Sequence, residues 1–210
     1  MAKLFGFNKS ANAFLSSHDP EKLLKEATSL KKSGDIEGAI LKLKSAYRGI
    51  AKTNITWSVN TFIRLPQYLQ IAGRNDDAWR EFNNLLLGYP NQLNSLEVLP
   101  MDHSIIYDKM RLFLHREKRY KEAILFGVFS YLCWIKGLYL QKRKREARDF
   151  LKQESIASML NGLLRRAKMT DMMDEYKKII LEETKYLPDI DLSRVESRFK
   201  NANMGIKLTR

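Results

Sequence analysis

Apolar residues recur at helical spacing along most of the chain, and short polar breaks separate the apolar stretches. The first stretch begins at Asp19-Pro20-Glu21, which combines an N-cap residue, a proline suited to the first helical position and an acid in the first turn. Its apolar face consists of Leu23, Leu24, Ala27 and Leu30. This spacing predicts a helix that runs to about Lys32 and is closed by Gly34.

The same periodicity predicts a series of helix pairs along the rest of the chain. The predicted pairs are 20–32 with 36–51, 58–72 with 75–87, 101–116 with 119–141, and 154–167 with 171–185. Pro66 should kink or divide its helix, and Pro188 should end the last pair. No run alternates Val, Ile and Thr as a strand would, so we expect an all-α fold of three to four stacked antiparallel hairpins.

Three regions are expected in the chain of 210 residues. Residues 1–18 should form a flexible N-terminal extension, and residues 19–187 a single helical-hairpin repeat domain. Residues 188–210 should form a C-terminal capping segment and tail, with a short helix over 191–199 and frayed residues from 201 onward.

One phrase occurs three times: an apolar stretch, a short polar break, and a return to apolar residues. The copies span Leu30–Ile40, Leu69–Trp79 and Leu114–Ile124. An alanine follows the break in each copy, at Ala39, Ala78 and Ala123. We expect each copy to be the tight turn of a helical hairpin, with the alanine where two helices approach closely.

This recurrence resembles the tetratricopeptide repeat over residues 20–135. The matching positions are Ala27, Leu30, Gly34, Ile36, Ala39, Leu43 and Ala46, then Leu69, Gly73, Ala78, Phe82 and Pro90, then Leu114, Tyr120 and Ala123. The three alanines are 39 and 45 residues apart, so the repeats are stretched beyond the family's period of about 34. The resemblance implies a curved stack whose concave face grips a peptide, a helix or another protein. A related helical repeat and an irregular bundle are the alternatives.

Polar residues on the first helix of each predicted hairpin are the candidates for lining such a groove. They are Lys25, Lys32, Asn60, Arg64, Gln67, Gln70 and Arg111. Lys and Arg number 37 against 24 Asp and Glu, a net charge of +13 that favours an acidic or anionic partner. The leading hypothesis is therefore a non-enzymatic adaptor that binds another protein, one variant being an inhibitor or immunity-type protein that masks an effector.

A basic run supplies the alternative hypothesis. Its residues are Lys142, Arg143, Lys144, Arg145, Arg148 and Lys152. On one continuous helix, Lys144, Arg148 and Lys152 would recur every four residues and form a ridge that binds nucleic acid or another anion. A solvated helix end would explain the same run without a ligand. A second basic strip, Arg165, Arg166 and Lys168, meets the last predicted turn.

No catalytic, cofactor-binding or metal-binding residues are expected. The glycines form no phosphate-binding loop, and His18, His103 and His115 are isolated from one another in sequence. The single cysteine, Cys133, lies between Leu132 and Trp134 and should be a buried structural thiol. A lone cysteine and an N-terminus without signal-peptide features favour a cytoplasmic location.

The most apolar segment is Ala123–Leu140. Lys136 interrupts it, whereas a membrane-spanning helix needs roughly 20 largely apolar residues in succession. We therefore expect no membrane span and interpret the segment as a helix buried on most sides within the stack.

Overall fold

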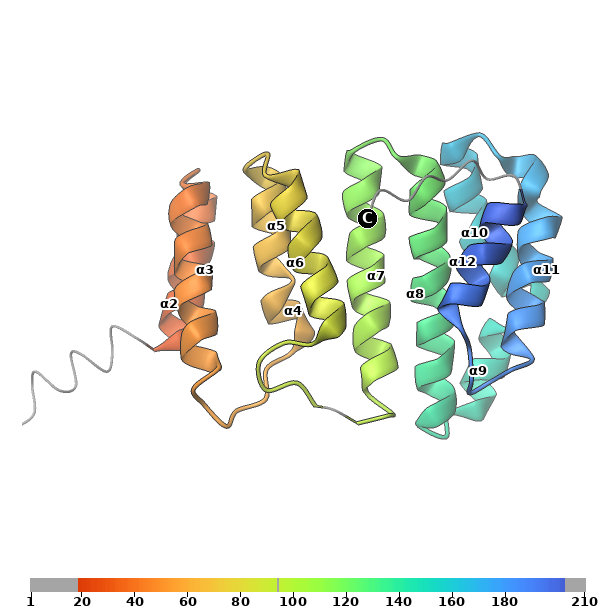
Figure 1. The fold of residues 1–210 in the computed structure, drawn as a ribbon, viewed down its shortest axis with the longest axis horizontal. Helices are drawn as coiled ribbons and strands as arrows, with labels where there is room; N and C mark the ends of the chain where they lie inside the picture. Colours follow the sequence, from red (N-terminus) through yellow and green to blue (C-terminus); the bar gives the residue numbers. More distant parts are fainter. Residues whose placement is uncertain (1–18, 94, 203–210) are drawn as a thin grey trace, which may run out of the picture. The chain divides into compact units, whose positions relative to one another are not determined.

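The computed structural model describes residues 19–93 and 95–202, and these form helices and turns with no strand among them (Figure 1). The predicted all-α class is thereby confirmed. Contacts divide the chain into two compact units, unit 1 (Met1–Gln92) and unit 2 (Leu93–Arg210), where the sequence suggested one run of hairpins over 19–187. The predicted extension over 1–18 and the last residues of the predicted tail lie outside the described residues.

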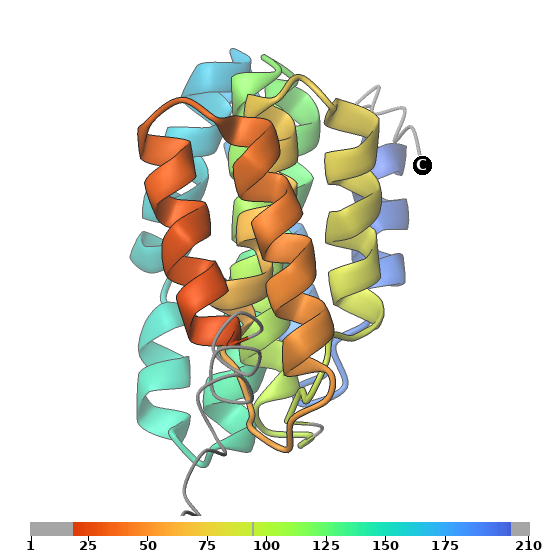
Figure 2. The ribbon, with the colours of Figure 1, turned by 90° about the vertical axis from the view of Figure 1, so that its left-hand side faces the viewer.

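Unit 1 contains α2 (Pro20–Lys32), α3 (Ile36–Ile50), α4 (Val59–Phe62), α5 (Arg64–Ile71) and α6 (Asn75–Leu87). α2 packs along α3, as Figure 2 shows, and α5 contacts both α3 and α6. The predicted N-cap is present, because the Asp19 side chain accepts a 3.0 Å hydrogen bond from the backbone N–H of Glu21. The helix boundaries predicted for this unit agree with the structure within about two residues.

Pro66 divides the predicted helix over 58–72, and the break between α4 and α5 falls at Ile63. Proline has no N–H, so the carbonyl of Phe62, four residues earlier, has no helical partner there. The hydroxyl of Tyr47 on α3 donates to this carbonyl over 3.2 Å and to that of Thr61 over 2.7 Å. Burial raises the pKa of the Tyr47 hydroxyl, so it stays protonated and bridges α3 to the break.

Unit 2 contains α7 (Leu99–Arg116), α8 (Tyr120–Leu140), α9 (Lys144–Phe150), α10 (Gln153–Ala167), the 3₁₀ turn η1 (Thr170–Met172), α11 (Met173–Thr184) and α12 (Leu192–Asn201). α7 and α8 make the most extensive helix pair. The predicted short helix over 191–199 is α12, and it packs on α8 and α11. The short helix α9 has no counterpart among the predicted pairs.

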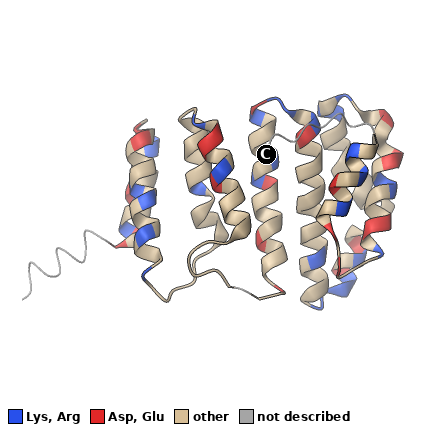
Figure 3. Cartoon of the chain, viewed as in Figure 1, with Lys and Arg blue, Asp and Glu red and all other residues tan. Residues whose placement is uncertain are grey.

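α8 is the central helix of unit 2, since it contacts α7, α9, α10, α11 and α12. Most of its length is free of charge (Figure 3). By length and composition it is the one described helix that could cross a membrane, yet 67% of its most apolar window is buried inside the protein. Contacts on several sides explain why its sequence has so little amphipathic pattern.

The same turn ends five of the described helices, and the three copies of the repeated phrase are among them. A residue with positive φ follows the helix, and the N–H of the next residue donates to a leucine carbonyl five positions back over 2.9–3.0 Å. These donor and acceptor pairs are Asp35 to Leu30, Arg74 to Leu69, Arg119 to Leu114, Arg143 to Leu138 and Met169 to Leu164. This hydrogen bond satisfies a carbonyl that the helix end would otherwise leave open, which is the role of a Schellman motif.

A fourth full copy of this phrase, which is not among the predicted turns, spans Leu138–Arg148. Lys142 takes the left-handed position with φ 61°, and Ala147 is buried at the position of Ala39 and Ala78. This copy is conspicuous for its basic residues, but its spacing from leucine to alanine is that of the other three copies. Leu138 follows Leu114 by only 24 residues, because the two turns share one helix. α8 is the helix after the third turn and also the helix before the fourth.

An arginine and an acid three residues later pair in three of these turns. The pairs are Arg74 with Asp77 at 2.7 Å, Arg119 with Glu122 at 2.5 Å and Arg143 with Glu146 at 2.5 Å. The first turn has Asp35 in place of the arginine and Gly38 in place of the acid. The Asp35 side chain accepts a 2.8 Å hydrogen bond from the N–H of Gly38. A Cβ at Gly38 would lie 2.3 Å from the Asp35 carboxylate, so this cap requires glycine.

Replacing Ala39 or Ala78 with leucine should destabilise unit 1 by about 1–3 kcal/mol, because both alanines are fully buried and a larger side chain would overpack the helix contact. Urea-induced unfolding measures the loss. Lys44→Leu, at an exposed position of α3, is the control and should change the free energy of unfolding little. Alanine variants as stable as the parent would show that these positions are not close helix contacts.

Candidate functional site

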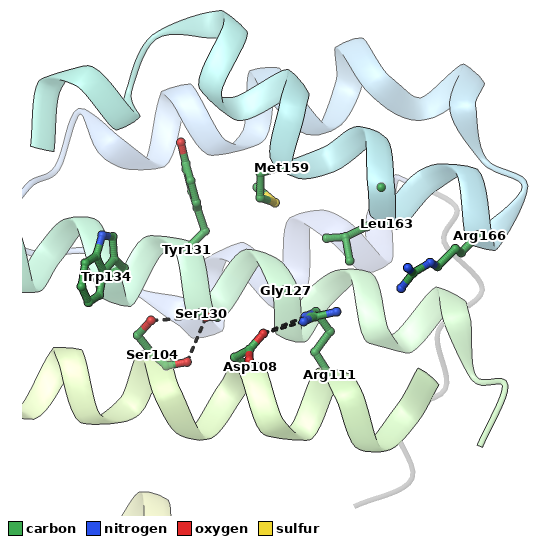
Figure 4. Close-up of a pocket in the computed structure, with 11 residues that line it drawn as sticks. Ser104, Asp108, Arg111, Gly127, Ser130, Tyr131, Trp134, Met159, Leu163 and Arg166 are labelled. Carbon is green, nitrogen blue, oxygen red and sulfur yellow. Dashed lines mark hydrogen bonds and ion pairs between the residues drawn. The ribbon is translucent and has the colours of Figure 1, made fainter. Parts of the chain in front are cut away.

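A pocket of about 390 Å³ opens between α7, α8 and α10 of unit 2 (Figure 4). It is lined by Ser104, Asp108, Arg111, Gly127, Ser130, Tyr131, Trp134, Met159, Gly162, Leu163 and Arg166. Volumes of this order are typical of ligand sites in proteins.

One end of the pocket carries two guanidinium groups. Arg111 on α7 donates to Oδ1 of Asp108 from Nε over 3.0 Å and from Nη2 over 2.6 Å, and only 20% of its side chain is exposed. Arg166 on α10 extends toward this end, and its Nη1 lies 3.0 Å from Nδ1 of His115. Two cations with a single carboxylate leave an excess of positive charge here.

His115 takes one defined tautomer in this arrangement. A guanidinium only donates, so Nδ1 accepts the hydrogen bond from Arg166 and the ring proton resides on Nε2. Burial and the charges of Arg111 and Arg166 lower the pKa of His115, against a smaller opposing effect of Asp108. The imidazole therefore orients Arg166 as a neutral acceptor near neutral pH and adds no third cation.

The other end of the pocket combines hydroxyls with apolar side chains. Ser130 donates to the carbonyl of Ser104 over 2.9 Å, and Tyr131 donates to the carbonyl of Phe150. Trp134 and Met159 supply apolar surface there, and Leu163 continues it toward the two arginines. The pocket thus offers an anion site next to an apolar wall.

Two glycines shape the space in between. A Cβ at Gly127 would lie 2.6 Å from Leu163 Cδ1 and 3.1 Å from Arg111 Cδ, so the glycine lets α10 and Arg111 pack closely on α8. Gly162 has no atom within 4 Å of where its Cβ would be, so it leaves the wall of α10 open. A side chain at Gly162 would enter the pocket.

The seven predicted groove residues are divided between the two units. Arg111 lines the pocket in unit 2, whereas Lys25, Lys32, Asn60, Arg64, Gln67 and Gln70 lie in unit 1. Arg64 also has a structural role, because its Nη2 donates to the Leu24 carbonyl over 2.9 Å and to the Thr28 hydroxyl over 2.8 Å. Of the second basic strip, Arg166 enters the pocket.

The prediction of one continuous ridge through Lys144, Arg148 and Lys152 is wrong. α9 ends at Phe150, and Lys152 takes extended backbone as the N-cap residue of α10. Lys142 and Arg143 belong to the preceding turn, so only Lys144, Arg145 and Arg148 share a helix.

Several charges of this basic run have partners. Lys152 pairs with Asp149 at 2.8 Å, and Lys144 lies over the Tyr139 ring at 5.3 Å from its centroid. Arg143 is held by Glu146 as described above. Lys142, Arg145 and Arg148 are exposed and make no ion pair within the described residues.

Nothing in the described part of the chain resembles a metal site: no three His, Cys, Asp or Glu side chains are grouped as ligands would be. Cys133 is buried, as predicted, with 5% exposed. Burial raises the pKa of its thiol to about 12, the opposite of what a nucleophile needs.

Compared with models of protein families, with curated proteins and with solved structures, the chain shows no match. Its function therefore has to be inferred from its own residues. The pocket between α7, α8 and α10 is the feature with the most definite chemistry.

Proposed function

We propose that this protein is a non-enzymatic, tetratricopeptide-like helical-repeat adaptor that binds an acidic segment of another protein. The pocket between α7, α8 and α10 holds a carboxylate of that segment, and its apolar wall receives a neighbouring side chain. An inhibitor that masks an effector is one form such an adaptor can take.

The placement of Arg111 and Arg166 carries this proposal. The two guanidiniums come from different helices, and Figure 4 shows them at the same end of the pocket. Only Asp108 compensates them there, and it is already engaged by Arg111. Guanidinium is the cation whose geometry best matches a carboxylate, so the vacant donors of Arg166 suit a glutamate or aspartate side chain.

Three other observations support the adaptor proposal. The chain has a net charge of +13, which favours encounter with acidic partners. Its turns repeat one geometry, as expected when similar helix pairs are placed in succession. The hydroxyls of Ser130 and Tyr131 in the pocket donate to backbone carbonyls and to no basic side chain, which favours a binding role.

Arg166→Gln should weaken binding of fluorescein-labelled hexaglutamate about tenfold. This factor corresponds to the low end of the free energy that a hydrogen bond to a charged group contributes. Fluorescence anisotropy at constant ionic strength measures the change. Arg165→Gln is the matched control, because it removes the same charge from the next residue, which is exposed but does not line the pocket. Hexaglutamine should not bind.

An equal loss in both arginine variants would contradict the pocket assignment and indicate binding by overall charge. The nucleic-acid alternative is tested in the same assay with a labelled single-stranded oligonucleotide. Replacing Lys142, Arg145 and Arg148 with serine should leave hexaglutamate binding intact. If this variant alone abolishes strongly salt-dependent oligonucleotide binding, the alternative replaces the adaptor proposal.

A further inference from the structure

Unit 2 contains a second, mainly apolar cavity of about 440 Å³, separate from the arginine pocket. Its walls are Leu99, Pro100, Leu132, Leu140, Pro188 and Ile190. None of these residues lines the pocket between α7, α8 and α10. The cavity therefore needs an explanation of its own.

Three parts of the chain form this cavity. Residues 132, 133, 136 and 140 recur at helical spacing along one face of α8, and Leu99, Pro100 and His103 occupy the first turns of α7. The connection from Pro188 to Leu192, between α11 and α12, supplies the third wall. Leu96, which is 84% exposed, extends the apolar surface at the rim.

Lys136 is the one cation of this lining. It is half-buried on α8 among apolar neighbours, and no ion pair engages it within the described residues. The other charged residue of the lining, Asp189, is exposed, so water screens its carboxylate more than the ammonium of Lys136. The cavity thus joins an apolar volume to one unpaired positive charge.

We propose that this cavity binds a small single-chain amphiphile that has an apolar tail and a carboxylate head. The tail lies between α7 and α8, and the head pairs with Lys136. The volume falls in the range of about 300–1,000 Å³ that is usual for small-molecule sites, and the predominance of leucine, isoleucine and proline in the walls suits an alkyl chain. Partial burial strengthens the pairing of the ammonium with the head.

The test is calorimetric titration of the full chain with dodecanoate below its micelle concentration. Dodecyltrimethylammonium, which has the same tail and the opposite charge, is the comparison ligand. Pairing with Lys136 favours dodecanoate, pairing with Asp189 favours the ammonium compound, and apolar binding alone favours neither. We expect dodecanoate to bind at least tenfold more tightly. Lys136→Met should remove this preference, whereas Lys121→Met, at an exposed position of α8 outside the cavity, should retain it.

Thermal unfolding of both variants shows whether each remains folded. For the Lys136 variant, binding of dodecanol at the parental affinity provides a second readout, because the apolar walls are unchanged. Equal affinity for both charged amphiphiles, or no binding of dodecanoate to the parent, would overturn the proposal. The proposal would also be overturned if the parent formed a dimer that dodecanoate converts to monomer, with an affinity for dodecanoate that falls as the protein concentration rises. A second copy of the chain would then occupy the cavity.

Discussion

Arg194→Met should lower the free energy of unfolding of unit 2 by about 2–3 kcal/mol, because the buried Glu183 carboxylate loses its charged partner while Arg194 itself is partly solvated. Arg194 on α12 donates from Nη2 and Nε to the two carboxylate oxygens of Glu183 on α11, over 2.6 Å and 2.8 Å. The Glu183 side chain is 0% exposed, and it also accepts from the N–H of Asp191. Denaturation followed by far-UV circular dichroism measures the loss.

A neighbouring ion pair provides the matched control. Arg198 on α12 pairs with Glu182 on α11, but the Glu182 side chain is 35% exposed. Arg198→Met should therefore cost no more than about 1 kcal/mol. The double variant Glu183→Leu with Arg194→Met should recover most of the lost stability, because it leaves no buried charge unpaired. Equal losses from the two single arginine variants would refute this distinction.

Cys133 should react with iodoacetamide at pH 8 roughly 10³-fold more slowly in the native protein than in the urea-unfolded chain. Burial raises the pKa of its thiol to about 12, against about 8.5 for an unperturbed thiol, and only the thiolate reacts. The higher pKa leaves far less thiolate at pH 8. Mass spectrometry follows the reaction at a single site, because the chain has one cysteine.

The urea-unfolded sample shows that the reagent and the thiol are both competent. Rapid stoichiometric labelling under native conditions would mean that the α8 face bearing Cys133 is open to solvent. That result would also contradict the high pKa that burial gives this thiol.

Local signals in the sequence predict the helices well. The cap at Asp19, the division at Pro66 and the turns at Gly34 and Gly73 all depend on residues within one helical turn of one another. Each such feature has a physical cause that acts locally: a side-chain acceptor, a missing N–H, or freedom to adopt positive φ.

The site was much harder to predict. Arg111 and Arg166 are 55 residues apart, and only the packing of α10 on α8 brings them to one pocket. Gly127 contributes by lacking a side chain, which no motif signals. The fourth turn has a different explanation: Lys142 lies within a run of basic residues whose charge is more conspicuous than its spacing, although Lys118 takes the same left-handed position in the third turn.

The central position of α8 has a consequence for synthesis of the chain. Its apolar residues are covered on one side by α7, which precedes it, and on the others by α9 to α12, which emerge from the ribosome later. Until then a 21-residue helix with the composition of a membrane span is exposed on the nascent chain. Packing of α9 to α12 on α8 therefore has to follow synthesis closely if this segment is not to aggregate.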